Sequence, residues 1–411
     1  MERSLESLLL RHHFPEERMA FVVGPRQVGK TTLARKILDA RKCPQLYFNW
    51  DDLGFRRSVS RDPYGFTDRF IPVTGALKPL LVLDEIHKFP RWKTYLKGLW
   101  DTRKDKFDVL VTGSGRLDIY QKGGDSLLGR YGLYRLHPLS VKEVLSPRVS
   151  LAEADPESTL RALVLSPGEP AADVASAFDA LFKWGGFPEI FLRKDRRRLR
   201  LWHAERRRLI VREDLRDLSR IQLLSHVETL VELLVLRAGG VLSYNSLRAD
   251  LQVALDSVRL WTTALARLYF IYFVRPYSKR IARAIKKEPK VYLWDWSEIE
   301  DNGRRFENMI AGHLLKWCHF TQDFGFEPLE LHYIRDKEQR EVDFLVTKTG
   351  KPWILIETKL SGTDPGRALH YYADKLAVRH KLLVVADLKR SGIAGDVRVI
   401  AAPSFCASLP V

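Results

Sequence analysis

The sequence predicts an α/β protein with several domains, and three observations carry this prediction. The chain has 411 residues, which is more than one hydrophobic core usually organises. Near the N-terminus, a short apolar strand runs into a glycine-containing loop and then into an amphipathic helix. Near the C-terminus, three apolar strands follow one another with turn residues between them. We therefore expect an α/β domain at each end and a largely helical region between them.

Composition and charge narrow the class of protein. Hydrophobic residues make up 45% of the chain, and no stretch approaches the roughly 20 apolar residues of a membrane span, so we expect no membrane partner. The first apolar patch is too short and too acidic for a secretory signal, and the three cysteines are scattered, which suits a cytoplasmic protein. The net charge of +17 favours a polyanion such as DNA as a partner; an arginine-rich genome is the alternative explanation.

The first element is a phosphate-binding loop. Strand 20–23 is followed by a G-x-x-x-x-G-K-T pattern, whose glycines let backbone N–H groups face a phosphate at a helix N-terminus. Lys30 is expected to reach the β- and γ-phosphates of ATP, and the Thr31 hydroxyl to bind Mg²⁺. The expected nucleotide-binding residues are Gly24, Pro25, Arg26, Gln27, Val28, Gly29, Lys30, Thr31 and Thr32.

The second element is a strand that ends in two carboxylates. Residues 80–83 are apolar without alternation, which is typical of a parallel strand covered on both faces. Asp84 is expected to orient Mg²⁺, and Glu85 to polarise the water that attacks ATP. The second carboxylate favours ATP hydrolysis over binding alone; an ordinary acidic strand end is the alternative.

The third strand leads to further candidates for contact with the phosphates. Ser114 lies at the C-terminal end of the apolar strand in DVLVTGSGRLDI, at the edge where α/β sheets bind ligands, and is expected to sense the γ-phosphate or position water. Thr112 is the competing choice, and a plain turn is the alternative. Arg130 is expected to contact phosphate charge, within its own subunit or across a homo-oligomer; a solvated surface arginine is the alternative.

The middle of the chain is helical and basic. Residues 193–220 hold twelve basic and five acidic side chains, which form either a solvated face or a face that follows a DNA backbone. Further on, three helices and a hairpin follow the order of a winged helix, with a basic hairpin at 278–290. The third helix offers Ser257, Arg259 and Thr262 to DNA, or the same module docks a protein.

The C-terminal strands carry charged residues at a defined spacing. Glu357 and Lys359 lie two apart on one strand and therefore share a face, while Asp343 lies on the preceding strand. This array resembles the core of PD-(D/E)xK nucleases. The resemblance implies that Asp343, Glu357 and Glu307 bind a divalent cation, while Lys359 stabilises charge on water or phosphate. Glu341 either substitutes for a ligand or flanks the site, and an internal ion-pair network without metal is the alternative.

The order of the motifs also resembles a known family. The runs GPRQVGKTT, LVLDE, TGSG, LLGRY and HPLS, followed by WGGFPEIFL and IETK, are similar to prokaryotic AAA-type ATPases near the archaeal STAND-like group. These proteins carry a C-terminal DUF4143 domain, and the resemblance covers nearly the whole chain. It implies an ATPase domain (1–145), a helical lid and linker (146–222), a winged helix (223–295) and a nuclease-like domain (296–411). The implied function is an ATPase that acts on DNA; a switch that docks a protein, with an inactive nuclease-like domain, is the alternative.

Overall fold

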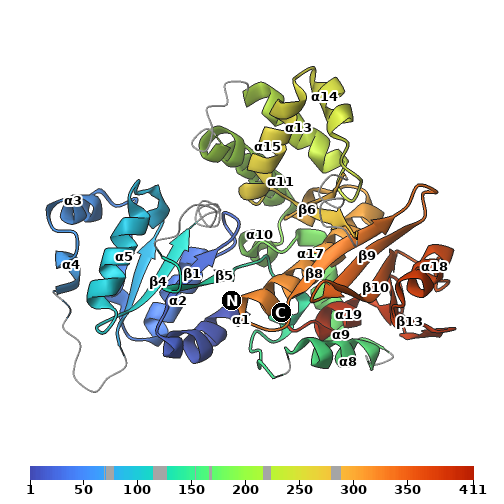
Figure 1. Cartoon of the computed structure of the whole chain (residues 1–411), viewed down its shortest axis with the longest axis horizontal. Helices are drawn as coiled ribbons and strands as arrows, with labels where there is room; N and C mark the ends of the chain where they lie inside the picture. Colours follow the sequence, from blue (N-terminus) through green and yellow to red (C-terminus); the bar gives the residue numbers. More distant parts are fainter. Residues whose placement is uncertain are drawn as a thin grey trace. The chain divides into compact units, whose positions relative to one another are not determined.

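The computed structural model describes residues 1–68, 70, 78–113, 127–152, 154–165, 169–215, 224–278 and 288–411. The chain divides into two compact units, Met1–His137 and Pro138–Val411 (Figure 1). The first has a parallel sheet, and the second has a helical region and a larger mixed sheet. The predicted α/β fold class with several parts is therefore confirmed, whereas the four finer segments remain a prediction.

The first unit is built on a parallel sheet. Five of the described strands pair in the order β2-β3-β4-β1-β5. Every residue of β1, β3 and β4 is buried, which explains why these strands are apolar along nearly their whole length. The strand that precedes the glycine loop does not pair with the strand that ends in two carboxylates, because β4 lies between them. The strands are β1 (Met19–Val23), β2 (Tyr47–Asn49), β3 (Leu80–Asp84), β4 (Asp108–Gly113) and β5 (Tyr131–Arg135).

Helical segments alternate with these strands along the chain. The longest are amphipathic, and α2 buries Leu33, Ile37 and Leu38 on one face. The segments are α1 (Ser4–Leu8), a π-helix (Leu9–His13), 3₁₀ turns (Phe14–Glu16, Pro44–Leu46 and Ile86–Lys88), α2 (Lys30–Ala40), α3 (Leu53–Arg61), α4 (Gly65–Asp68) and α5 (Trp92–Arg103).

The second unit begins with helices. One hydrophobic cluster includes Leu230 and Leu234 of α13, Leu247 of α14 and Leu265 of α15, so these three helices share a core. The helical segments are α7 (Val141–Leu145), α8 (Pro156–Val164), α9 (Ala172–Trp184), α10 (Pro188–Arg193), α11 (Arg196–Leu209), a π-helix (Ile210–Leu215), α13 (Leu224–Leu236), α14 (Tyr244–Leu251) and α15 (Leu255–Arg267).

The larger sheet follows these helices. Eight described strands take the order β12-β13-β11-β10-β9-β8-β6-β7, with β8, β9 and β10 antiparallel and β11 parallel to β10. The strands are β6 (Ile271–Pro276), β7 (Lys290–Leu293), β8 (Leu329–Arg335), β9 (Glu341–Lys348), β10 (Lys351–Lys359), β11 (His380–Val385), β12 (Gly392–Ala394) and β13 (Val397–Ala401). The associated helices are a 3₁₀ turn (Trp296–Glu298), α17 (Asn302–Asp323), α18 (Arg367–Leu376) and α19 (Ala402–Ser408).

One irregularity of this sheet matters for the candidate site. Between β8 and β9, His332 is opposite Leu345 and Ile334 is opposite Val342, so one residue of β8 between these pairs faces two residues of β9, Asp343 and Phe344. A bulge of this kind reverses the alternation of side chains in the bulged strand. None of the described helices combines the length and apolar character that a membrane span requires.

Candidate functional site

The glycine loop of the first unit lies between β1 and α2. Gly29 has a φ of +102° and is the N-cap of α2, a conformation that favours glycine. A Cβ on Gly24 would collide with the carbonyl oxygen of Leu136. The first N–H groups of α2 therefore face outward from a tight turn, beside the exposed residues Thr31 and Thr32. This geometry suits a bound phosphate.

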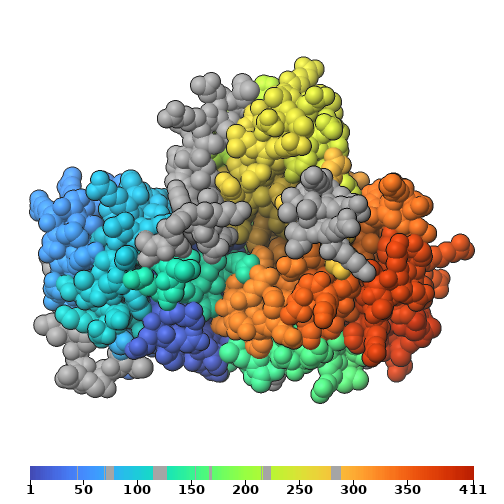
Figure 2. All heavy atoms as spheres, viewed as in Figure 1, coloured from blue at the N-terminus to red at the C-terminus, as the bar shows by residue number. Residues whose placement is uncertain are grey.

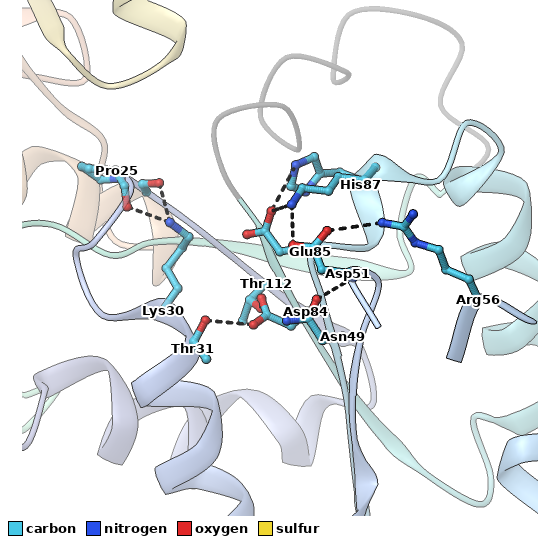
Figure 3. A network of polar contacts seen from close by, with 12 residues as sticks. Pro25, Lys30, Thr31, Asn49, Asp51, Arg56, Asp84, Glu85, His87 and Thr112 are labelled. Carbon is cyan, nitrogen blue, oxygen red and sulfur yellow. Dashed lines mark hydrogen bonds and ion pairs between the residues drawn. The ribbon is translucent and has the colours of Figure 1, made fainter. Parts of the chain in front are cut away.

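Lys30 is buried within this loop. Its Nζ atom donates to the carbonyl oxygens of Gly24, at 2.9 Å, and Pro25, at 2.7 Å (Figure 3). Since both acceptors belong to the loop, the ammonium is held next to the turn whose N–H groups are available to an anion.

Asp84 is the centre of a hydroxyl cluster. Its Oδ2 atom accepts from Thr31 Oγ1 at 2.8 Å, and its Oδ1 atom accepts from Thr112 (Figure 3). The Oδ2 atom also accepts from Tyr47 Oη at 2.5 Å. Burial, followed by the hydrogen bond to Asp84, raises the pKa of Tyr47 to about 12. A hydroxyl and a carboxylate at this separation are oxygen donors of the kind that Mg²⁺ prefers, so the residues present fit a magnesium ion.

Glu85 takes an unusual backbone conformation directly after β3. Its φ is +57°, and its N–H donates to the Thr112 carbonyl at 3.0 Å. Its carboxylate lies 3.3 Å from Lys88 Nζ and 3.6 Å from His87 Nε2. A left-handed non-glycine residue at the carboxyl edge of a parallel sheet is an observation that points to a functional position.

A second cluster of charges lies in the second unit. The Nζ atom of Lys290, at the start of β7, is 3.0 Å from Glu307 Oε1 and 2.6 Å from Glu341 Oε1. The Tyr292 hydroxyl also donates to Glu307 Oε1, at 2.7 Å. Burial alone would lower the pKa of Lys290, but the charges of Glu307, Asp343 and Glu341 raise it above its ordinary value.

Asp343 adjoins this cluster. Its Oδ2 atom accepts from both the N–H and the hydroxyl of Thr358, each at 2.8 Å. Burial, and then the charge of Glu307, raise the pKa of Asp343 to about 7. The carboxyl group is therefore coupled to Glu307 and Lys290.

Glu357 and Lys359 have other partners. Glu357 accepts from the N–H of Gly366, the N-cap of α18, at 2.8 Å. Lys359 donates to the carbonyl of Asp364 at 2.6 Å and lies 3.5 Å from Glu357. Thr358, which lies between them in β10, bonds Asp343 instead. The strand thus presents Thr358 to Asp343 and its two charged residues to the start of α18.

A third group of side chains could hold a metal by proximity alone. His203, Asp295 and Glu298 bring one ligand atom each within 4.8 Å of one another. Glu298, however, is already 2.8 Å from Arg207 and 3.4 Å from the buried Arg206, and His203 is 3.3 Å from Asp295. These contacts make the group an ion-pair network that attaches α11 to the turn at 296–298.

Comparisons with protein families divide the chain into three matches. A family model described as an AAA domain matches residues 16–145. Two domains of unknown function, DUF8612 and DUF4143, match residues 175–297 and 302–405. The chain thus joins an AAA domain to a C-terminal DUF4143 domain. The AAA domain contains the glycine loop, Asp84 and Glu85, and the DUF4143 domain contains Glu307, Asp343, Glu357 and Lys359.

Comparisons with individual proteins give less information about function than the family models do. Two uncharacterized proteins, from Mycobacterium bovis and Mycobacterium tuberculosis, are each 23% identical over 362 residues, which is 86% of this chain and 73% of theirs. Among solved structures, the ORC1 protein of Aeropyrum pernix in complex with DNA aligns with a TM-score of 0.27 at 19% identity. That alignment covers 75% of this chain and 90% of the other.

In the AAA domain, the structure brings together Lys30, Thr31, Asp84 and Glu85 at one edge of the sheet. Ser114 lies outside the described residues. Thr112 is 1% exposed and bonds Asp84, so it positions a carboxylate and does not face a phosphate. Arg130 lies at the other edge, where its carbonyl accepts from the N–H of Met19, the first residue of β1, and its side chain pairs with Asp101. Its side chain is thus bound to α5 at the edge opposite the glycine loop.

In the DUF4143 domain, the residues expected to form one site are divided. Asp343 and Glu307 belong to the cluster around Lys290, whereas Glu357 and Lys359 face α18. The shared pocket expected from strand alternation is therefore wrong for this structure, because the bulge in β9 changes the direction in which Asp343 points.

Two surface assignments from the sequence are also corrected. Thr262 is fully buried and donates to the Val258 carbonyl, so Thr263 takes its place on the exposed face of α15. Lys290, counted with the basic hairpin, is buried.

Two residues of these sites, Tyr47 and Lys290, were not predicted from the sequence. Tyr47 gave no signal in the sequence, because only the pairing of β2 with β3 brings its hydroxyl to Asp84. Nothing in the sequence marked Lys290 as a residue of the carboxylate cluster, since a lysine in a basic hairpin is normally solvated.

Proposed function

We propose that this chain hydrolyses ATP in its AAA domain and that the bound nucleotide controls how the second unit holds DNA. The observation that carries the proposal is the hydrogen bond between Thr31 and Asp84, with Glu85 next in sequence, at the N-terminus of α2. A helix start, a buried lysine and two carboxylates at one sheet edge are the parts that phosphoryl transfer to water requires.

The proposed roles follow from position. The N–H groups of residues 24–32 hold the phosphates of ATP, and Lys30 turns from the loop carbonyls toward the β- and γ-phosphates. Thr31 and Asp84 hold Mg²⁺, which neutralises phosphate charge when it is bound. Glu85 polarises the attacking water. Ser114 keeps its proposed role as a sensor, and Arg130 can act only from a neighbouring subunit of a homo-oligomer.

DNA binding is assigned to α13–α15 and the hairpin β6–β7, as a winged helix. The order of these elements supports this assignment, as does the bridge between Val241 and Lys290, which adds a short third strand beside the hairpin. The exposed face of α15 presents Arg259, Thr263 and Arg267 at four-residue spacing, and this helix lies at the surface of its unit (Figure 2). The basic residues of the hairpin tip, Lys279, Arg280, Lys286 and Lys287, lie outside the described residues.

One observation favours docking of a protein at the same face. Leu260 of α15 is 55% exposed and lies between Arg259 and the buried Trp261. An exposed leucine on this helix suits an apolar contact better than a phosphate backbone. A switch that binds a protein partner is therefore the second candidate.

Cleavage of DNA is not part of the proposal. The elements α17, β8, β9, β10, α18 and β11 follow the order of the nuclease-like core, which supports a nuclease-like fold. The expected catalytic residues are nevertheless divided between two places, with Glu357 bonded to the start of α18.

The two candidates are separated by DNA binding of the purified chain, measured over a range of salt concentrations with and without ATP. The measurement with ATP uses the Glu85→Gln variant, because this variant is expected to keep ATP bound. The proposal predicts an affinity for duplex DNA that falls steeply with salt and changes at least threefold when ATP is added. Binding that is weak, independent of salt and unaffected by ATP would favour the protein-docking switch.

A further inference from the structure

Four charged side chains meet where β7, α17 and β9 come together in the second unit. Lys290 opens β7, Glu307 lies in α17, and Glu341 and Asp343 lie in β9. The ammonium is 2.6 Å from one glutamate oxygen and 3.0 Å from the other, and the Lys290 side chain is 3% exposed. The ring of Tyr333 lies 5.7 Å from the same Nζ atom. A cation is thus already present among the carboxylates.

Four of the six carboxylate oxygens of Glu307, Glu341 and Asp343 contact hydrogen-bond donors. Glu307 Oε1 accepts from both Lys290 and Tyr292, and the second oxygen of Glu341 lies 3.3 Å from the guanidinium of Arg335. A divalent ion binds such oxygens at about 2.0–2.6 Å, so it would need the lone pairs that these donors use. It would also meet the repulsion of a buried positive charge beside it. The residues present do not fit a divalent metal ion while Lys290 remains in place.

The rest of the nuclease-like motif does not complete a metal site either. Both protons that Thr358 offers are donated to Asp343 Oδ2, and Glu357 is satisfied by Gly366 and Lys359. Removing one partner of a buried ion pair is costly, because it leaves an uncompensated charge. The carboxylates and Lys290 therefore depend on one another.

We propose that the ammonium of Lys290 is the permanent cation of this carboxylate site and takes the place of the divalent metal that a nuclease-like layout implies. The lysine comes from the hairpin β6–β7, so it also fastens that hairpin to α17 and β9. The DUF4143 domain then serves as a rigid support for the hairpin and not as a metal-dependent nuclease. This inference does not depend on ATP hydrolysis or on DNA binding.

Binding of Mn²⁺ to the full chain tests the proposal directly. The titration is followed by electron paramagnetic resonance without nucleotide, in the Asp84→Asn chain, so that the metal site of the AAA domain is removed. We expect no Mn²⁺ to bind in the second unit at millimolar concentration, and Asp343→Asn to change nothing further. A bound Mn²⁺ ion that disappears on Asp343→Asn or Glu307→Gln would overturn the proposal.

Thermal stability gives a second readout. Lys290→Met is expected to lower the melting temperature of the second unit by roughly 10 °C, because the partly buried carboxyl groups of Glu307, Glu341 and Asp343 lose their buried counter-charge. Adding Glu307→Gln should restore part of this loss, and Lys351→Met, at an exposed lysine of β10, is the matched control. If Lys290→Met does not fold, the Lys290→Met/Glu307→Gln double variant and the Mn²⁺ titration still test the proposal. A Lys290→Met chain as stable as the wild type would refute the inference.

Discussion

At the scale of single residues, the surroundings of each carboxylate decide its role. Asp84 accepts hydrogen bonds from three hydroxyl groups, those of Thr31, Tyr47 and Thr112, so it remains suited to a hydrated metal ion. Glu85, one residue later, is held beside His87 and Lys88 by a left-handed backbone. Glu307 and Glu341, by contrast, are bonded to a buried lysine. Under the proposed function, carboxylates therefore serve ATP hydrolysis in one unit and structure in the other.

Glu85→Gln tests the role of the second carboxylate of β3. The amide keeps the shape of the side chain but cannot polarise water, so ATP turnover should fall at least about 100-fold while ATP binding changes little. Turnover is measured by phosphate release and binding by titration with a fluorescent ATP analogue. Glu17→Gln is the control, because Glu17 is an exposed carboxylate that precedes β1, at the opposite edge of the sheet. A loss of nucleotide affinity as large as that of Lys30→Ala would make Glu85 a structural or metal-binding residue instead.

At the scale of elements, strands and helices were more predictable than the directions of individual side chains. Apolar runs identified β1, β3 and β4 because parallel strands are buried on both faces. The turn 347–351 was correctly expected to join two antiparallel strands. The bulge in β9 could not be predicted, since it depends on pairing with β8 and has no local signal at Asp343. The burial of Arg206 against Phe187 and Glu298 likewise depends on tertiary contacts.

The contact between α7 and α17 at His313 predicts that the stability of the second unit depends on pH. His313 is neutral and held in one tautomer, since its Nδ1–H donates to Met309 and its Nε2 accepts from Val141. Burial lowers the pKa of His313 to about 4. Between pH 6.5 and 4 the unfolded chain therefore binds a proton that the folded chain does not, and stability should fall by up to about 3 kcal/mol as the pH falls.

Urea unfolding of the second unit at several pH values measures this effect. His313→Gln should have a flatter dependence of unfolding free energy on pH between 6.5 and 4. His12→Gln, at an exposed histidine, should leave the dependence unchanged. Identical slopes in all three proteins would show that the pKa of His313 is the same in the folded and the unfolded chain.

The basic residues of the hairpin predict how strongly DNA affinity depends on salt concentration. Replacing Lys279, Arg280, Lys286 and Lys287 with Glu should weaken DNA binding and reduce the slope of log affinity against log salt by up to about 3–4, because each lost phosphate contact releases one counterion fewer. Fluorescence anisotropy with a labelled duplex provides the measurement. An unchanged affinity and slope would favour protein docking through Leu260.

At the scale of the whole molecule, the candidate nucleotide site lies in one unit and the proposed ligand-binding region lies in the other. The AAA and DUF4143 matches lie in different units, and the DUF8612 match includes α13–α15 and the hairpin. The sequence could predict this order of parts because each part carries its own local pattern. It could not predict the cation of the carboxylate cluster, because Lys290 comes from a hairpin distant in sequence from β9.

ATP turnover by the full chain, with and without duplex DNA, tests the central claim most directly. Wild type is compared with Lys30→Ala, and Lys36→Ala is the control because this lysine lies on the same helix and bonds the carbonyl of Met1. We predict Mg²⁺-dependent phosphate release that DNA alters, that Lys30→Ala reduces at least about 100-fold, and that Lys36→Ala preserves. Turnover that is equal in all three proteins, or absent from the wild type with and without DNA, would contradict the account.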